Sequence, residues 1–458
     1  MQLYPGAPTE TRPNYLPKLA LKPWVKPPPE DLMLTNARVV QPATGTILEK
    51  HTIIVKNGSI ASVVSDEVQK SRKDKDKDNE EIRTVDLNGA YVCPGLIDCH
   101  VHVTAVPGVK NMNEYTQLPE QDINLRTAYV LKEMLLRGFT TVRDTGGASK
   151  RIALAIEEGL IPGPRLIQCG KALSQTGGHG DSAPALSGGP STDCCSGHAS
   201  GLSRVADGVP QVLKAVREEL KAGADFIKIM VGGGVASETD AIETVQYTAD
   251  EIRAITTTCR QMGGKMTTAH AYTVDAIRHA MTNGVTGIEH GNLIDKATAK
   301  LMASNGIYLT PTLSCYGIMV RPPFEDFLPP DGKVKNAQVM AQGLEALRIA
   351  HEAGVTICYG SDLLTSMHAL QTEEFSVRAG VLPSNAVLKH ATTNAAQMLG
   401  KSSLIGTISR GAYADLLVLN ANPVEDVTVL DRPEEHLLVV MKQGRVFSSL
   451  IEGLKVDL

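Results

Sequence analysis

Two histidines separated by one residue, His100 and His102, follow the apolar run at residues 92–98. Residues two apart on a strand point the same way, so both imidazoles can reach one metal ion. An isolated His-x-His is more often a pair of ordinary histidines on a half-buried strand. Here Pro94 and Gly95 mark a turn into a buried strand whose polar residues gather at its carboxyl end. Parallel barrels carry their active sites at that end, so the pair indicates a metal site.

A lysine, Lys228, lies inside the apolar run at residues 224–231. Burial disfavours the ammonium ion and should lower the pKa of the amine. Such a lysine can snorkel to the surface or pair with an acid. The functional alternative is that the neutral amine takes up carbon dioxide and becomes a carbamate, an anion that can bridge two metal ions. A lysine side chain is long enough to span the pocket and reach such a bridging position.

Two further histidines, His270 and His290, stand at the ends of apolar stretches, with an amphipathic helical pattern at residues 274–283 between them. This spacing is that of one strand-helix-strand repeat, so the histidines occupy equivalent places on neighbouring strands. Either alone would be interpreted as a core histidine. Together they indicate metal ligands.

An aspartate, Asp362, ends the apolar stretch at residues 355–362, directly after Gly360 and Ser361. An aspartate in this context can simply cap a helix. Given the five other groups on strand ends, we expect a role beside the metal and its water. There the carboxylate can hold the attacking water and later carry its proton to the leaving group.

Together these elements resemble the amidohydrolase superfamily and, within it, the imidazolonepropionase-like branch, which includes binuclear Xaa-Pro dipeptidases, related carboxypeptidases and an ochratoxin-hydrolysing amidase. The resemblance covers roughly residues 30 to 450, and the segment 172–181 is similar to the dipeptidase and ochratoxinase-type members. The elements that carry it are the run 94–102, the strand lysine, the two later histidines and Gly360-Ser361-Asp362. The resemblance implies a homo-oligomer with two metal ions per chain. It implies that His100, His102 and Asp362 bind one ion, that His270 and His290 bind the other, and that a carboxylated Lys228 bridges them.

Apolar strand segments alternate with helical patterns through residues 94–404, which indicates an α/β fold with a parallel sheet. Eight segments give the count of a (β/α)8 TIM barrel. They are residues 92–102, 140–144, 165–167, 224–231, 265–272, 285–292, 308–311 and 355–362. The Gly- and Ser-rich segment 174–209 should form a functional loop at the catalytic end of the barrel.

The two chain ends differ from this pattern. Residues 30–93 and 405–458 contain short alternating strands, with a hairpin marked by Asn57 and Gly58, and should form one small β-sandwich domain flanking the barrel. Residues 1–29 are rich in proline and should form an extended arm. The charged run 71–81 should be a solvated loop.

Composition excludes some classes of protein. The formal net charge of −5 shows no excess of basic residues that could bind phosphates, so nucleic acid is not an expected partner. No apolar stretch reaches the roughly 18 to 20 residues of a membrane span, and no secretory signal is recognisable at the N-terminus. The eight cysteines lack a disulfide spacing, and the cluster Cys194, Cys195 and His198 lacks that of a zinc site. Reduced thiols and a cytoplasmic location are therefore expected.

The expected function is cleavage of a C–N amide bond by a metal-bridging hydroxide, with Asp362 and Lys228 as catalytic residues. The substrate would be an N-acyl amino acid, a dipeptide or an ochratoxin-like amide. We expect zinc, although these ligand types also suit manganese. Two rivals are a cyclic-amide hydrolase of imidazolonepropionase type and a deaminase, which usually have one metal ion and no bridging lysine. A third, a non-catalytic scaffold, should have lost ligands.

Substrate-binding residues are less clearly marked. His179 on the long loop could bind a substrate group or a developing oxyanion, or could anchor its loop. Tyr272, two residues beyond a ligand, should point into the same pocket. Glycines 232–234 could offer backbone N–H groups to a substrate carboxylate, or could simply let the chain turn.

Overall fold

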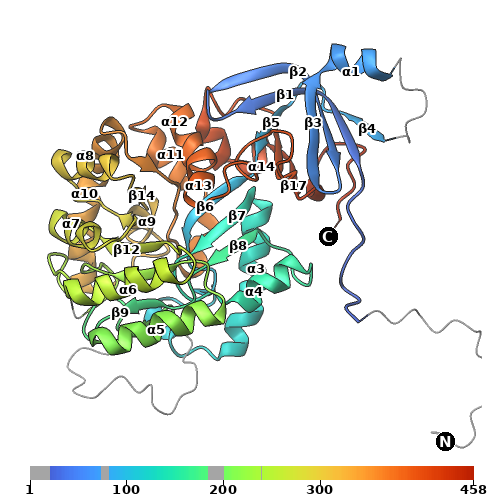
Figure 1. Ribbon diagram of the computed structural model, residues 1–458. Coiled ribbons are helices and arrows are strands. Elements are labelled where there is room, and N and C mark those ends of the chain that lie inside the picture. The colour runs from blue at the N-terminus through green and yellow to red at the C-terminus, as the bar shows by residue number, and fades with distance from the viewer. Residues whose placement is uncertain (1–20, 74–81, 184–200, 239, 458) are drawn as a thin grey trace, which may run out of the picture.

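The computed structural model describes residues 21–73, 82–183, 201–238 and 240–457. It has a large part, in which parallel strands are surrounded by helices, and a smaller sheet at one end (Figure 1). In the smaller sheet the first strands of the chain, drawn in blue, lie beside the last ones, drawn in red. The cluster of cysteines and histidine at 194–198 lies outside the described residues.

Both chain ends contribute to the smaller sheet, whose order is β18-β17-β16-β5-β1-β2-β3, with β4 paired to β1. The hairpin between β2 and β3 is present, and Asn57 and Gly58 have φ angles of 49° and 76°. The strands are β1 (Leu32–Gln41), β2 (Thr46–Lys56), β3 (Ser59–Ser65), β4 (Arg83–Asp86), β5 (Tyr91–Pro94), β16 (Leu416–Leu419), β17 (Leu437–Lys442) and β18 (Arg445–Ser449).

Hydrogen bonds connect all of these strands into one continuous sheet. It curls, because Ala414 N donates to Gly58 O and Ile60 N to Ala412 O, which brings the segment before β16 beside β3. Alternate residues of strands from both chain ends, including Val55 and Val418, share one hydrophobic core. The helix α1 (Asp66–Lys73) extends into the start of the charged run that we expected to be a loop.

The large part contains two parallel sheets. One has the order β6-β7-β8, and the other has the order β10-β9-β11-β12-β13-β14-β15. Strands occur at all eight expected positions, namely β6 (Leu96–Val101), β7 (Phe139–Asp144), β8 (Arg165–Gln168), β11 (Ile227–Met230), β12 (Thr267–Ala271), β13 (Gly287–His290), β14 (Tyr308–Thr310) and β15 (Thr356–Ile357). Two short strands, β9 (Ala172–Ser174) and β10 (Ser203–Val205), were not expected. They pair in parallel at the two ends of the long glycine-rich segment.

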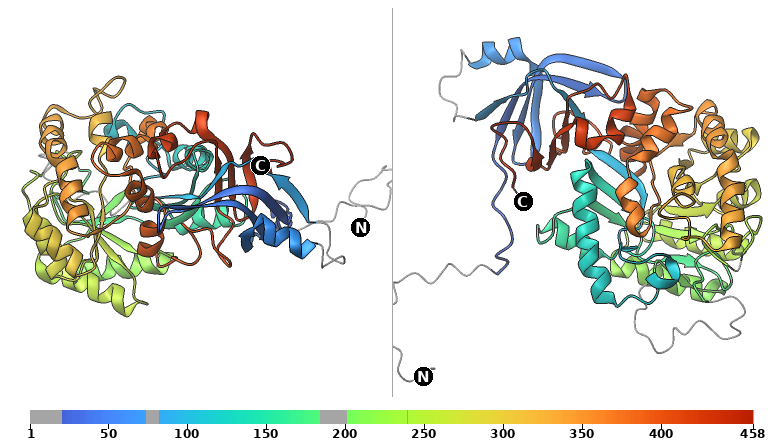
Figure 2. Two further views of the ribbon diagram at one scale, coloured as in Figure 1. Left: turned by 90° about the horizontal axis from the view of Figure 1, so that it is seen from above. Right: turned by 180° about the vertical axis from the view of Figure 1, so that it is seen from behind.

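Helices cover the outer side of these strands (Figure 2). The pattern at residues 274–283 forms α7 (Val274–Thr282) as predicted, and α6 (Ala249–Gln261) begins with a capping box made by Thr248 and Glu251. The longer helices are α3 (Glu120–Leu136), α4 (Lys150–Glu157), α5 (Gly208–Ala222), α6 (Ala249–Gln261), α8 (Lys296–Ser304) and α10 (Pro330–Glu352). The shorter ones are α2 (Met112–Tyr115), α9 (Ser314–Ile318), α11 (Glu373–Ala379), α12 (Ser384–His390), α13 (Thr393–Met398), α14 (Pro433–His436), and the 3-10 helices η1 (Thr365–Leu370) and η2 (Val427–Asp431).

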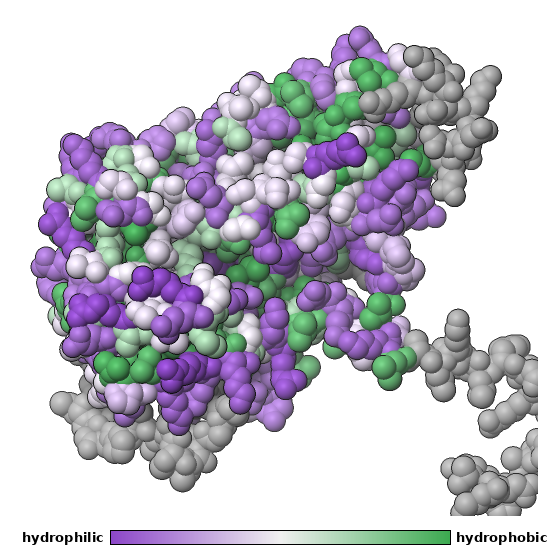
Figure 3. Space-filling model, viewed as in Figure 1, coloured by the Kyte–Doolittle hydropathy of each residue, from purple (hydrophilic) through white to green (hydrophobic). Residues whose placement is uncertain are grey.

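Hydrophilic and hydrophobic residues are interspersed on the face shown in Figure 3. Among the described residues, no helix combines the length and the apolar character that crossing a membrane requires. The strands β6, β7, β11, β12 and β13 are buried along their whole length, as expected of parallel strands with helices packed on them.

Candidate active site

The carboxylate of Asp362 lies among the histidines that end the neighbouring strands. Its Oδ1 is 3.3 Å from His100 Nε2 and 3.2 Å from His102 Nε2, and its Oδ2 is 4.0 Å from His290 Nδ1. The ligand atoms of Asp362, His100 and His102 all lie within 4.8 Å of one another. Asp362 makes no helix cap, since the 3-10 helix that follows begins only at Thr365.

His270 extends this cluster. Its ring centroid is 4.6 Å from that of His290, and the centroid of His290 is 5.0 Å from that of His100. The four predicted histidine ligands therefore form a continuous group around Asp362, although they come from residues far apart in the chain.

Each imidazole in the group is held through one ring nitrogen. His102 Nδ1 lies 3.0 Å from the carbonyl oxygen of Gly146, and His270 Nε2 lies 3.0 Å from that of Gly233. A carbonyl oxygen only accepts hydrogen bonds, so these two nitrogens carry the hydrogen. The other nitrogen of each of these two rings then carries no hydrogen and has a lone pair, which is the form that a metal ligand needs, although His102 Nε2 also lies 3.4 Å from the hydroxyl oxygen of Thr145.

His100 is held by a carboxylate that sequence reasoning missed. Glu289 Oε2 lies 2.8 Å from His100 Nδ1, and Glu289 Oε1 accepts from Arg143 Nη2 at 2.6 Å and from the hydroxyl of Thr268. Burial alone would raise the pKa of Glu289, but Arg143 and His100 hold it below its ordinary value. The ionised Glu289 thus fixes the ring of His100 with Nε2 facing Asp362.

Replacing Glu289 with glutamine should destabilise the fold, because it leaves the buried guanidinium of Arg143 without a counter-charge. We expect a loss of about 3–5 kcal/mol, seen as a lower urea midpoint of unfolding. The matched control is Glu345→Gln, which breaks an exposed ion pair with Arg348 and should leave the midpoint unchanged. Equal midpoints for the two variants would show that the buried ion pair of Glu289 and Arg143 does not stabilise the fold.

A second missed carboxylate, Asp98, joins the strand of His100 to the segment of Asp362. It accepts from the backbone N–H of His100 at 3.0 Å and from the hydroxyl of Ser361 at 2.6 Å. Gln371 Nε2 donates to it as well, at 2.9 Å. Asp98 therefore holds two of the predicted ligand strands at a fixed distance.

Lys228 on β11 is only 2% exposed. No hydrogen bond or ion pair with another described residue reaches its amine. Burial lowers the pKa of this amine, although the charges of Glu289 and Asp362 raise it. A buried amine of lowered pKa beside four imidazoles and a carboxylate is a donor set that fits two divalent ions and a carbamate.

Two of these strand-end residues have unusual backbone conformations. His290 has a φ angle of 74° and Asp362 one of 50°, which is the left-handed region that non-glycine residues rarely adopt. Such residues collect at functional sites, where the surrounding structure imposes the conformation. The bond from Asp362 N to His100 O, 2.8 Å long, is part of that constraint.

Both candidate substrate residues border the histidine group. The ring of His179 stacks on His270 with centroids 4.2 Å apart, and the ring of Tyr272 meets His270 edge-on at 4.8 Å. The hydroxyl of Tyr316, which the sequence did not single out, donates to that of Tyr272 at 3.1 Å and lies 3.2 Å from His290 Nδ1.

The expectation that glycines 232–234 bind a substrate carboxylate is wrong. Their three N–H groups donate within the protein, to His270 O at 3.2 Å, Thr244 O at 3.3 Å and Asp240 Oδ2 at 3.1 Å. The glycines serve close packing instead, because a Cβ at Gly234 would overlap the ring of His179.

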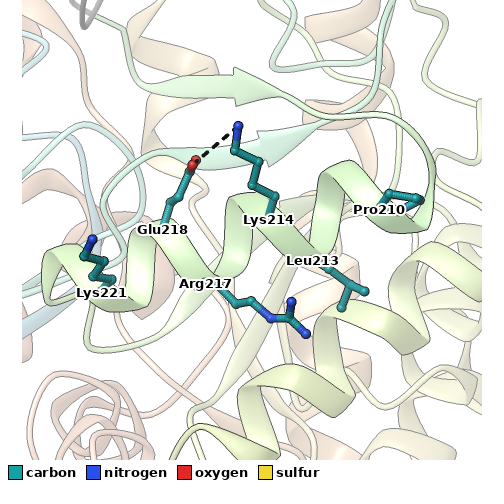
Figure 4. Close-up of a pocket in the computed structure, with 6 residues that line it drawn as sticks. All are labelled: Pro210, Leu213, Lys214, Arg217, Glu218 and Lys221. Carbon is teal, nitrogen blue, oxygen red and sulfur yellow. Dashed lines mark ion pairs between the residues drawn. The ribbon is translucent and has the colours of Figure 1, made fainter.

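A surface hollow near α5 does not belong to this site (Figure 4). All of its lining residues come from α5, and none lies at the end of a strand. They are Pro210, Leu213, Lys214, Arg217, Glu218 and Lys221.

Comparisons with known proteins agree with the geometry. The ochratoxinase of Aspergillus niger is 31% identical over 369 residues, which are 77% of this chain and 75% of that protein. A prolidase crystallised with N-methylphosphonate-L-proline is 41% identical, with a TM-score of 0.85 over 92% of this chain and 100% of its own. An Xaa-Pro dipeptidase with bound methionine is 27% identical, with a TM-score of 0.78 over 92% of this chain and 100% of its own. The model of the amidohydrolase family matches residues 91–447, and the chain therefore belongs to that family.

Proposed function

We propose that the protein is a binuclear metal-dependent hydrolase that cleaves small amides. The observation that carries this proposal is the convergence around Asp362 of imidazole nitrogens and of a buried amine that has no hydrogen-bond or ion-pair partner among the described residues. His100, His102 and Asp362 would hold one divalent ion, His270 and His290 the other, and a carbamate on Lys228 would lie between them. Zinc suits this donor set.

The scaffold of this site is proposed to be a closed (β/α)8 barrel of residues 94–404, flanked by a small domain of residues 30–93 and 405–458. Hydrogen bonds between the two parallel sheets support closure. Asp225 N donates to Gln168 O, beside β8 and β11, and Cys99 N donates to Tyr359 O, beside β6 and β15, each at 2.8 Å. With these two links every neighbouring pair among the eight strands is connected.

When bound, two divalent ions supply Lewis acidity toward the substrate carbonyl and lower the pKa of water held at the site. Asp362 is the residue placed to move the proton. Its side chain is 17% exposed while those of its histidine neighbours are more deeply buried, so it is the group that incoming water meets. It takes the proton of the attacking water and delivers it to the leaving nitrogen.

The proposed substrates are amides whose leaving amine carries a carboxylate, foremost dipeptides ending in proline, and also N-acyl amino acids and ochratoxin-like amides. The prolidase, dipeptidase and ochratoxinase relatives support this class. Tyr272 is a suitable carboxylate ligand, because its hydroxyl accepts from Tyr316 and keeps its own proton to donate. The position of Lys228 favours this class over cyclic-amide hydrolases and deaminases with one metal ion.

Elemental analysis of the purified protein should find about two divalent ions per chain, because six ligands can support two coordination spheres. Fully active protein with a single ion would contradict the binuclear proposal and leave the amide chemistry to a single metal.

Dipeptides ending in proline should be hydrolysed, and their C-terminal amides should be turned over at least about tenfold less efficiently, a gap of roughly 1.4 kcal/mol. The charge that Tyr272 binds is absent from the amide. A screen that compares kcat/KM for each acid with that for its amide tests this, with lactams as the control class. Equal values for acid and amide, or activity on lactams alone, would reject the substrate class.

A further inference from the structure

A hydrogen-bonded chain runs from His179 to a buried carboxylate on the loop after β11. His179 Nδ1 lies 2.9 Å from the hydroxyl oxygen of Ser237, and that hydroxyl donates to Asp240 Oδ1. Ser237 and Asp240 are both buried, whereas Glu238 beside them is exposed. We infer that Ser237 and Asp240 form a relay that fixes the ring of His179 for the reaction, which makes them positioning residues of the proposed amide hydrolysis.

The relay determines which ring nitrogen carries the hydrogen. Since the hydroxyl hydrogen of Ser237 goes to Asp240, the oxygen of Ser237 is left to accept, so His179 Nδ1 must donate to it. Among the described residues His179 Nε2 has no hydrogen-bond partner, and it is the nitrogen left to meet a substrate. The ring keeps this orientation because it also stacks on His270, 4.2 Å away.

The same carboxylate holds the backbone of His179 by a second route. Gln246 Nε2 donates to Asp240 Oδ2 at 2.8 Å, and Gln246 Oε1 accepts from the backbone N–H of His179 at 3.0 Å. Asp240 therefore holds both the ring of His179, through Ser237, and its backbone, through Gln246. A group held at two points loses little freedom when substrate binds, which is how preorganisation contributes to rate.

A lysine from α10 braces the loop that carries the relay. Lys335 Nζ donates to the carbonyl oxygens of Gly234, Ser237 and Asp240, at 3.2, 2.5 and 2.9 Å. Because Lys335 contacts this loop only through its backbone carbonyl oxygens, the side chains of Ser237 and Asp240 remain available to His179. Lys335 therefore holds the loop, whereas Ser237 and Asp240 orient His179. Substitutions can distinguish these two roles.

The test is a double-mutant cycle on kcat/KM for a dipeptide substrate. We expect Ser237→Ala to lower kcat/KM about tenfold, mainly through kcat, and Ser237→Thr, which keeps the hydroxyl, to retain most of it. The matched control Glu238→Gln on the same loop should be unchanged. In a His179→Ala background, Ser237→Ala should cause no further loss. An equal loss in both backgrounds would show that Ser237 serves only the loop and would overturn the relay.

Two outcomes separate the relay from the function on which it rests. If His179→Ala keeps full activity, the substrate role of His179 is wrong, and the relay with it. If no amide is hydrolysed at all, amide hydrolysis is wrong, and nitrogen NMR of histidine-labelled protein then decides the relay. We expect His179, assigned with His179→Asn, to carry its hydrogen on Nδ1, and to lose that preference in Ser237→Ala. An unchanged spectrum in Ser237→Ala would overturn the relay.

Discussion

Replacing Lys228 with alanine should lower kcat/KM by at least about 10³-fold, equivalent to ~4 kcal/mol, because it removes the proposed bridge between the two metal ions. The fold should survive, since the amine makes no hydrogen bond or ion pair with a described residue. The measurement is steady-state kinetics together with elemental analysis, in which the metal content should also fall. Added bicarbonate should not restore activity, because alanine has no amine to carboxylate.

The matched control is Lys442→Met. Lys442 is also a buried lysine, and burial lowers its pKa to about 8, but it belongs to β17 of the smaller sheet and its amine donates to the carbonyl oxygen of Gly163, just before β8 begins. This variant should keep its metal content and turnover even if it unfolds more easily. Near-normal turnover in Lys228→Ala would refute the proposed carbamate at Lys228, whatever the result for Lys442→Met.

Replacing Asp362 with asparagine should lower kcat by about 10² or more with a smaller effect on KM. Asparagine keeps the size and some coordinating power of aspartate, but it cannot take the proton from water. Asp250→Asn, which changes an exposed carboxylate on α6, should behave as wild type. A change confined to KM in Asp362→Asn would assign Asp362 to substrate binding and leave proton transfer to another group.

The eight strand positions and the six ligand-type residues could be predicted from the sequence for physical reasons. The four histidines and Asp362 stand near the point where an apolar run changes to polar residues, and that boundary is visible along a single stretch of chain, as at His290 and Asp362. Lys228 is visible in another way, as a charged residue inside an apolar run. The repeat of strand and helix then places such boundaries side by side, so spacing alone brings His270 next to His290.

The supporting residues could not be found in this way. Glu289 and Arg143 stand inside buried strands, and their partner strands are far away in the sequence. A charged residue within an apolar strand signals that a partner exists, but not which one. The same limit explains the error at glycines 232–234, since their N–H acceptors become neighbours only when the loop folds back.

The order of strands in the smaller sheet also has a consequence for how the protein is made. Strand β5 lies between β1 and β16 and leads directly into β6, which carries His100. Strands β16 to β18 are synthesised after β6 to β15, so during synthesis one edge of β5 has no partner while the strands of the candidate site are already outside the exit tunnel. A nascent chain, or a product truncated before β16, would expose that edge to other chains. Mutations in β16 to β18, or translational stalls before them, should therefore cause aggregation, although they lie hundreds of residues from the first histidines of the site.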